Sequence, residues 1–189
     1  MPLVLVVHEN RELNPYIKDV ARRLAKAGFM AFAPDALFTL GGYPGNDEGR
    51  TMQRSLDREK IQQDFIAAAK FLKNHPNSNG NLGSVGFCLG GYIVNYLAAV
   101  EPKLLTAGVP FYGTPAKQEL RKNITASLLI QLGELDKIVN NSWPEYEKTL
   151  KIWVLLTKCT FTKELIMVFI MISPHAIIKK MPNLPGNVL

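Results

Sequence analysis

The chain has 189 residues, of which 47% are hydrophobic and 20% charged, and it carries a formal net charge of +6. This length and composition indicate one globular domain of ordinary size, and they exclude the disordered and collagen-like classes. The lysines and arginines are spread along the chain without a basic stripe interleaved with aromatics, so we do not expect nucleic-acid binding.

The predicted elements alternate between strand and helix. In chain order they are a strand at 3–7, a helix at 15–27, a strand at 29–33, a loop at 39–49, a helix at 57–73, a strand at 82–87, a helix at 92–100, strands at 107–112 and 127–132, and a helix at 143–150. The β-branched runs are typical of strands buried on both faces, and the helical stretches have apolar residues on one side. This order predicts an α/β fold with a mostly parallel, right-handed sheet and helices on both faces.

The two cysteines, Cys88 and Cys159, give no disulfide framework, which favours a reduced, cytoplasmic protein. The first residues, Met1–Val7, contain no basic leader, and no apolar run approaches the roughly 20 residues of a spanning helix. We therefore expect no membrane association, no metal and no cofactor.

The segment Gly86-Phe87-Cys88-Leu89-Gly90-Gly91 lies between a predicted strand and a predicted helix. This is the pattern of a nucleophile elbow with Cys in place of Ser, in which small neighbours permit a tight, strained turn. The Cys88 thiol is then expected at a helix N-terminus, where the dipole and free amides favour the thiolate. The amide of Leu89 becomes an oxyanion donor. A buried structural cysteine beside a glycine-rich turn is the alternative.

Five segments in order resemble the dienelactone hydrolases, the carboxymethylenebutenolidase-type branch of the α/β-hydrolases. They are His8-Glu9-Asn10-Arg11, Phe32-Ala33-Pro34-Asp35, the elbow, Pro110-Phe111-Tyr112-Gly113 and Gly133-Glu134-Leu135-Asp136. The resemblance covers residues 3 to about 150 and implies a hydrolase of small-molecule esters or lactones with a Cys-Asp-His triad. The family's N-terminal strands are expected to be missing, so the sheet is expected to be incomplete at both ends.

The resemblance also implies roles for individual residues. Cys88 matches the nucleophile, Asp136 the acid that orients the histidine, and Glu9 a glutamate beside the thiol, while the amides of Asn10 and Leu89 match the oxyanion hole. A turn or N-cap position is the alternative for Asp136, and an ordinary loop carboxylate is the alternative for Glu9.

Three arginines and Glu12 also bear on the expected site. Family members bind the substrate carboxylate with arginines, but spacing does not choose among Arg50, Arg54 and Arg58, and a solvated helix face is the alternative for each. Glu12 stands where the family commonly has glycine, and a left-handed backbone there would cost stability.

The triad histidine has no clear counterpart. His8 and His75 precede Asp136, and His175, which follows it, lacks the surrounding His-Gly-Phe-x-Asn-Asp pattern. The stretch 151–189 has no recognisable caps or amphipathic period, although its apolar run 165–172 is also compatible with a buried strand.

We interpret 151–189 as the family's C-terminal region read one base out of frame. Methionine has one codon, so joining each codon's last base to the next two bases gives Gly at Met167–Val168 and Asp at Met171–Ile172. In the same shifted reading, the codons of Ile166–Met167 permit His, and those of the pairs from Val168 to Met171 permit Phe, His and Asn. Together these residues spell His-Gly-Phe-His-Asn-Asp. The triad-histidine position is then occupied by Met167, whose thioether cannot accept the proton.

The sequence thus predicts two parts, a hydrolase-like domain at 1–150 and an atypical tail at 151–189. The predicted function is a cysteine-dependent ester or lactone hydrolase whose turnover is impaired by loss of the histidine. The alternatives are a non-catalytic remnant or binding module that keeps the pocket, and a flavodoxin-like binder. The latter fits the strand order but lacks a phosphate-cradling glycine-rich loop after the first strand.

Overall fold

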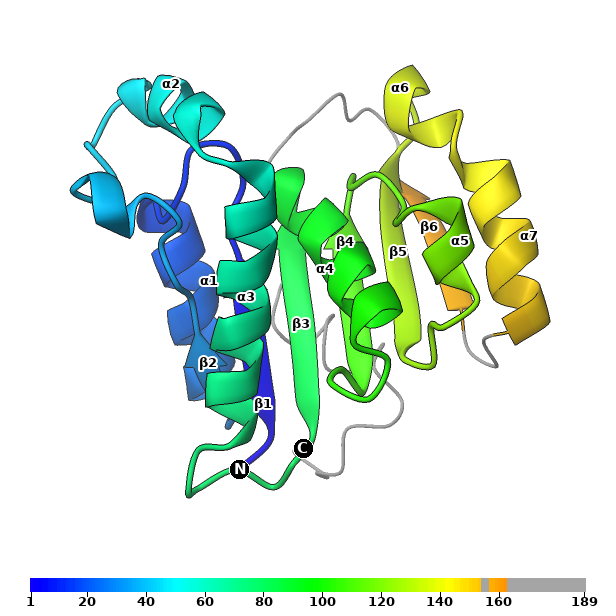
Figure 1. Cartoon of the computed structure of the whole chain (residues 1–189), viewed down its shortest axis with the longest axis horizontal. Coiled ribbons are helices and arrows are strands. Elements are labelled where there is room, and N and C mark those ends of the chain that lie inside the picture. The colour runs from blue at the N-terminus through cyan, green and yellow to red at the C-terminus, as the bar shows by residue number, and fades with distance from the viewer. Residues whose placement is uncertain (154–156, 163–189) are drawn as a thin grey trace.

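The computed structural model describes residues 1–153 and 157–162, and in this part of the chain six parallel strands form one sheet (Figure 1). The strand order is β2-β1-β3-β4-β5-β6. The strands are β1 (Leu3–Val7), β2 (Met30–Phe32), β3 (Leu82–Phe87), β4 (Ala107–Phe111), β5 (Ser127–Gly133) and β6 (Thr157–Thr162). Each consecutive pair in this order is parallel, which confirms the predicted α/β-hydrolase-like sheet.

Helices connect the strands over both faces of the sheet. They are α1 (Pro15–Lys26), α2 (Glu48–Ser55), α3 (Arg58–Lys73), α4 (Leu89–Val100), α5 (Gln118–Arg121), α6 (Lys137–Asn140) and α7 (Trp143–Trp153), with a short 3₁₀ helix, η1, at Phe38–Leu40. None of the helices in the described ranges is long and apolar enough to cross a membrane.

Two apolar cores lie on opposite faces of the sheet, and alternation along β1 divides its side chains between them. Leu3, Leu5 and Val7 join the core under α3, α4 and α7. Val4 and Val6 join the other core, with Ile17 and Leu24 of α1. A strand buried on both faces must be apolar at every position, which is why β1 reads as a continuous hydrophobic run.

Strands β1 and β3 are neighbours, but the chain leaves them in different directions. After β1 it enters α1 on one face, and after β3 it enters α4 on the other (Figure 1). Diverging connections leave a crevice at the carboxyl ends of two such strands, where α/β proteins place their ligands. Glu9 follows β1 and Cys88 follows β3, so the fold brings these two predicted residues to the same edge of the sheet.

The structure departs from the predicted elements in several places, among them the short helices η1, α5 and α6, which were not predicted. The predicted loop at 39–49 ends in the start of α2, and α4 begins at Leu89, directly after Cys88. Strand β6 lies within 151–189, where no organised element was predicted, and it pairs with β5 from Leu128↔Thr157 to Gly133↔Thr162. The division of the chain near residue 150 stays a prediction, and Met167 and His175 lie outside the described residues.

Candidate active site

Cys88 occupies the turn between β3 and α4 with a strained backbone. Its φ is 53° and its ψ is −109°, a conformation that residues with a side chain rarely adopt. Two hydrogen bonds hold it: the Cys88 N–H donates to the Phe111 carbonyl at 3.0 Å, and the Tyr92 N–H donates to the Cys88 carbonyl at 3.1 Å. The predicted strand, sharp turn and helix are therefore present, and the side chain is only partly buried.

The glycines around Cys88 allow backbone segments to touch. A Cβ on Gly86 would lie 2.1 Å from the Gly90 carbonyl oxygen, and one on Gly90 would lie 2.3 Å from that of Val7. Real side chains essentially never approach so closely, so no other residue fits without moving the backbone. Steric demand thus explains the G-x-C-x-G spacing that the sequence shows.

The surroundings of Cys88 raise the pKa of its thiol. Burial is the largest cause, and the negative charges of Glu9 and Asp136 add to it. A hydrogen bond from the Leu89 amide and the charge of Arg50 act in the opposite direction. The Leu89 amide acts in the direction expected of a helix N-terminus, but burial has the larger effect on the pKa of the thiol and the net shift is upward.

Glu9 sits in the loop directly after β1. Burial raises the pKa of its carboxyl, while the charge of Arg11 and a hydrogen bond from Asn14 lower it. Asn14 Nδ2 donates to Glu9 Oε1 at 3.2 Å, and the Asn14 side chain also caps α1 by accepting from Ile17 N–H. One asparagine thus fixes both the start of α1 and the carboxylate beside the thiol.

Asp136 is the N-cap of α6, after the end of β5. Its Oδ1 accepts a hydrogen bond from the Val139 N–H at 3.1 Å, so the N-cap role considered from the sequence is present. Its charge also acts on the Cys88 thiol. The two roles are compatible, because a carboxylate has lone pairs left for an imidazole.

Two residues that interact with Cys88, Arg50 and Tyr112, could not be assigned to the site from the sequence. Of the three candidate arginines, Arg50 on α2 acts electrostatically on both Cys88 and Glu9, whereas Arg58 stacks over the Tyr92 ring at 4.4 Å. Tyr112 follows β4 with a φ of 40°, and burial, followed by the charges of Glu9 and Cys88, raises the pKa of its phenol. The sequence did carry a signal for Tyr112, because this residue lies at the end of a predicted strand, within one of the segments that resemble the family.

Neither histidine within the described ranges serves Cys88. His75 lies in the turn that precedes β3, at the amino edge of the sheet, and its Nδ1 accepts from Asn77 N–H at 3.2 Å. His8 is fully buried in contacts with Glu9, Glu12 and Ala36. The part of the chain that the structure describes therefore supplies no imidazole to the thiol.

Comparison with known proteins decides the family. The model of the dienelactone hydrolase family matches residues 1–153, which include the elbow, Glu9 and Asp136. The chain belongs to this family. The resemblance found in the sequence is thereby confirmed.

Individual relatives agree with this dienelactone hydrolase assignment. The chain is 67% identical over 57 residues to the "Putative hydrolase fragment YghX" of Escherichia coli (strain K12), covering 30% of this chain and 49% of that protein. It is 36% identical over 152 residues to the "Putative carboxymethylenebutenolidase" of Aquifex aeolicus (strain VF5), covering 74% and 64%. The chain thus spans less than two thirds of the length of these curated relatives.

A solved structure shows the same fold. The dienelactone hydrolase from Anabaena variabilis superposes with a TM-score of 0.72 at 20% identity, over 95% of this chain and 82% of that chain. At the carboxyl edge of the dienelactone hydrolase sheet, the chain brings Cys88, Glu9, Asp136 and Arg50 into electrostatic contact. Asn10 lies in the turn after Glu9, at the same edge, and its role in an oxyanion hole stays a prediction.

Proposed function

We propose that this member of the dienelactone hydrolase family acts on a carboxylic ester or lactone through the Cys88 sulfur. The observation that carries the proposal is the backbone of Cys88, which is strained and held in the turn between β3 and α4. Strain at a residue with a side chain costs about 1–3 kcal/mol and is found mainly where function requires it. A structural cysteine in a turn has no need of this conformation.

The neighbouring groups support attack on a carbonyl carbon. The thiolate adds to the carbonyl, and the amides of Leu89 and Asn10 stabilise the oxygen that becomes negative. The Leu89 amide already hydrogen-bonds the Cys88 sulfur, so it lies at the reacting centre. Collapse of the adduct expels the alcohol and leaves a thioester, which water then hydrolyses.

Arg50 supports a substrate that carries a carboxylate. Its guanidinium acts on both Glu9 and Cys88, and a free arginine charge beside a nucleophile favours an anionic substrate group. In this proposal Arg50 binds the carboxylate and orients the ester toward the sulfur. Arg58 is engaged with the Tyr92 ring.

The weak step is proton transfer. A triad histidine takes the thiol proton and returns it to the leaving alkoxide, with Asp136 holding the ring. The described residues offer no such ring, and the pKa of the Cys88 thiol is raised. We therefore propose that this chain acylates slowly and turns over poorly, with Met167 in the histidine position of a frameshifted C-terminal region.

The raised pKa favours a second function, that of a binding module. A mostly protonated thiol leaves a crevice with Arg50 available to an anionic ligand but with little chemistry. Equilibrium dialysis with a non-hydrolysable carboxylate lactone analogue tests this function. Binding that is lost in Arg50→Gln, in a protein without esterase activity, supports the module.

The hydrolase proposal is tested by the kinetics of p-nitrophenyl acetate cleavage. We expect a burst of one p-nitrophenolate per chain followed by slow release, and we expect Cys88→Ser to abolish the burst. Cys159→Ser is the matched control and keeps it. A full steady rate without a burst, unchanged in Cys88→Ser, contradicts the proposal.

The frameshift proposal has a separate test. Sequencing of the locus should show codons for a histidine at the Met167 position in the frame shifted by one base after Lys151. Expression of the chain in that frame should raise steady turnover at least a hundredfold. If no shifted frame encodes His-Gly-Phe-His-Asn-Asp, or if the restored chain is as slow as this one, the proposal is wrong.

A further inference from the structure

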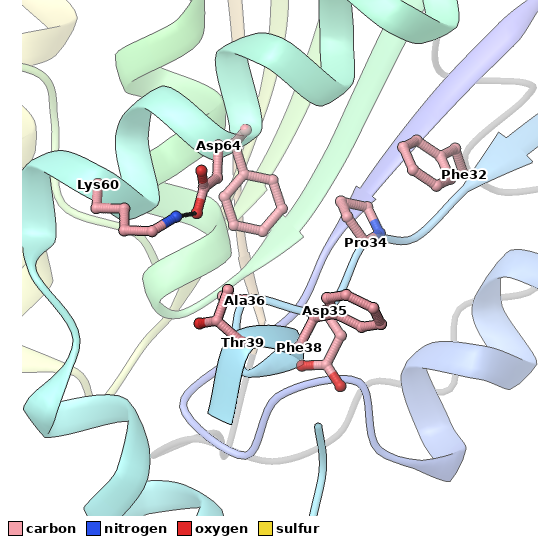
Figure 2. Close-up of a pocket in the computed structure, with 9 residues that line it drawn as sticks. Phe32, Pro34, Asp35, Ala36, Phe38, Thr39, Lys60 and Asp64 are labelled. Carbon is pink, nitrogen blue, oxygen red and sulfur yellow. Dashed lines mark hydrogen bonds and ion pairs between the residues drawn. The ribbon is translucent and has the colours of Figure 1, made fainter. Parts of the chain in front are cut away.

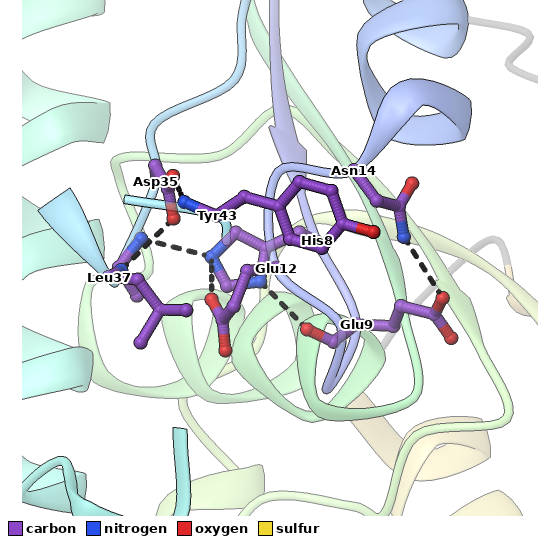
Figure 3. A network of polar contacts seen from close by, with 8 residues as sticks. His8, Glu9, Glu12, Asn14, Asp35, Leu37 and Tyr43 are labelled. Carbon is purple, nitrogen blue, oxygen red and sulfur yellow. Dashed lines mark hydrogen bonds and ion pairs between the residues drawn. The ribbon is translucent and has the colours of Figure 1, made fainter. Parts of the chain in front are cut away.

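A second polar cluster lies around the loop that follows β1. It consists of His8 at the end of β1, Glu12 in the loop before α1, and Asp35 in the loop after β2 (Figure 3). One ligand atom from each of the three side chains lies within 4.8 Å of the other two. None of the three has a role in the proposed hydrolysis.

Glu12 is the unusual member. Its side chain is 0% exposed, and neither carboxylate oxygen accepts a hydrogen bond within the described part of the chain. Its backbone also has a φ of 60°. A buried carboxylate without donors is strongly unfavourable, so the site requires a positive species close to these oxygens.

A neutral His8 does not supply that charge. Its Nδ1 lies 2.8 Å from the Glu9 carbonyl oxygen, which can only accept, so Nδ1 carries the hydrogen. The Ala36 N–H donates to Nε2 at 3.1 Å, which assigns the lone pair to Nε2. Yet Glu12 Oε2 lies 2.9 Å from the same Nε2, so with a neutral imidazole two acceptors face each other.

These features are also those of a metal-binding histidine. Metal-ligating imidazoles usually donate their other N–H to a carbonyl or carboxylate, which fixes the ring and its tautomer. The bond from Nδ1 to Glu9 O is such an anchor, and it aims the Nε2 lone pair at Glu12 (Figure 3).

Asp35 completes the donor set. Its Oδ1 accepts from Leu37 N–H at 3.0 Å and its Oδ2 from Tyr43 N–H at 3.1 Å, so two backbone amides fix the carboxylate. Each oxygen retains lone pairs for a further bond. One imidazole nitrogen and two carboxylates form a donor set that suits Zn²⁺ and similar divalent ions.

A cavity borders the cluster at Asp35. It has a volume of about 430 Å³, and Asp35 and Phe65 are in its wall (Figure 2). The Phe65 ring contacts the His8 ring edge-on, with centroids 5.6 Å apart, so the cavity adjoins the cluster. Asp35 is the only member of the cluster in the cavity wall, and His8 and Glu12 are 0% exposed, so a cation reaches them only when neighbouring side chains move.

We propose that His8 Nε2, Glu12 and Asp35 bind a divalent cation of the zinc type. The ion places positive charge between Nε2 and Glu12 Oε2 and gives the buried carboxylate its partner. The Ala36 amide must turn away from Nε2 when the ion binds, so the affinity is moderate. The alternative compensation is a proton shared between His8 and Glu12, which leaves Glu12 Oε1 without a partner.

The test uses the Cys88→Ser, Cys159→Ser protein stripped of metal, so that thiols do not bind the probe. Titration with Zn²⁺ by calorimetry should give one site per chain. In the same background Glu12→Gly should weaken binding at least tenfold. This variant should fold, because it removes both the buried carboxylate and the strain at φ 60°. Glu12→Gln, which keeps the side-chain size, should weaken binding as well.

The matched control is Asp64→Asn. Asp64 is in the wall of the same cavity but is paired with Lys60 at 2.6 Å and lies outside the cluster, so binding should not change. The proposal is overturned if no Zn²⁺ binds, if Glu12→Gly and Glu12→Gln bind as tightly as the parent, or if Asp64→Asn weakens binding equally. These tests do not depend on hydrolysis, since the nucleophile is absent.

Discussion

The carboxylate of Glu9 and the thiol of Cys88 lie at the carboxyl ends of the neighbouring strands β1 and β3, and they interact electrostatically. The charge of Glu9 raises the pKa of the Cys88 thiol, and Arg50 lowers the pKa of both groups. The Cys88 thiol, the Glu9 carboxyl and the Arg50 guanidinium therefore interact with one another electrostatically. The reactivity of the sulfur depends on which charges remain around it.

Opposite substitutions around Cys88 should change thiol reactivity in opposite directions. Glu9→Gln removes a negative charge, so the pKa of Cys88 falls and alkylation by iodoacetamide near neutral pH becomes about threefold faster or more. Arg50→Gln removes a positive charge, so the pKa rises and alkylation slows by a similar factor. The measurement is the pH profile of the alkylation rate in a Cys159→Ser background.

The control for these variants is Glu101→Gln, which removes a charge at the far end of α4 from Cys88. Its alkylation profile should match that of the parent. If Glu9→Gln and Arg50→Gln shift the profile in the same direction, the electrostatic account of the site is wrong.

Replacement of Glu12 by glycine should stabilise the protein. Glycine relieves the left-handed backbone at φ 60°, worth about 1–2 kcal/mol, and removing a buried carboxylate whose Oε1 has no partner adds about 1–3 kcal/mol. Urea unfolding in the presence of a chelator measures the total. Glu12→Ala removes the carboxylate but keeps the backbone strain, so it should recover only part of the gain. A Glu12→Gly variant less stable than the parent contradicts this reading.

Gly86 should not tolerate a methyl group. Because its Cβ would lie 2.1 Å from a backbone oxygen, we expect Gly86→Ala to lower the free energy of unfolding by about 3 kcal/mol or more, or to prevent folding. Gly80 has a φ of 81° but nothing within 4 Å of its Cβ position, so Gly80→Ala should cost only about 1 kcal/mol. Equal losses in the two variants, measured by thermal unfolding, would show that steric contact does not determine the elbow.

The sequence predicted the elements whose side chains repeat a simple pattern. β1 and β3 are buried on both faces, and the close contacts at Gly86 and Gly90 leave a visible glycine spacing. Helix α2 was missed because only Gly49 in it is buried, so no apolar period marks it.

The properties of the site were harder to predict than its location. The pKa of the Cys88 thiol depends on burial, which local sequence does not show, and burial outweighs the helix-terminus effect that sequence does show. Arg50, Arg54 and Arg58 look alike in the sequence. Only the packing of α2 and α3 brings Arg50 to Glu9 and Arg58 to Tyr92.

The most direct test of Cys88 as a nucleophile identifies the acylated residue. The chain is incubated with p-nitrophenyl acetate, quenched in acid, digested and mapped by mass spectrometry. We predict one acetyl group per chain, carried by the peptide that contains Cys88 and persisting for many minutes because neither histidine of the described residues assists its hydrolysis. Acetylation that is absent from Cys88, or equally present on Cys159, would contradict the central claim.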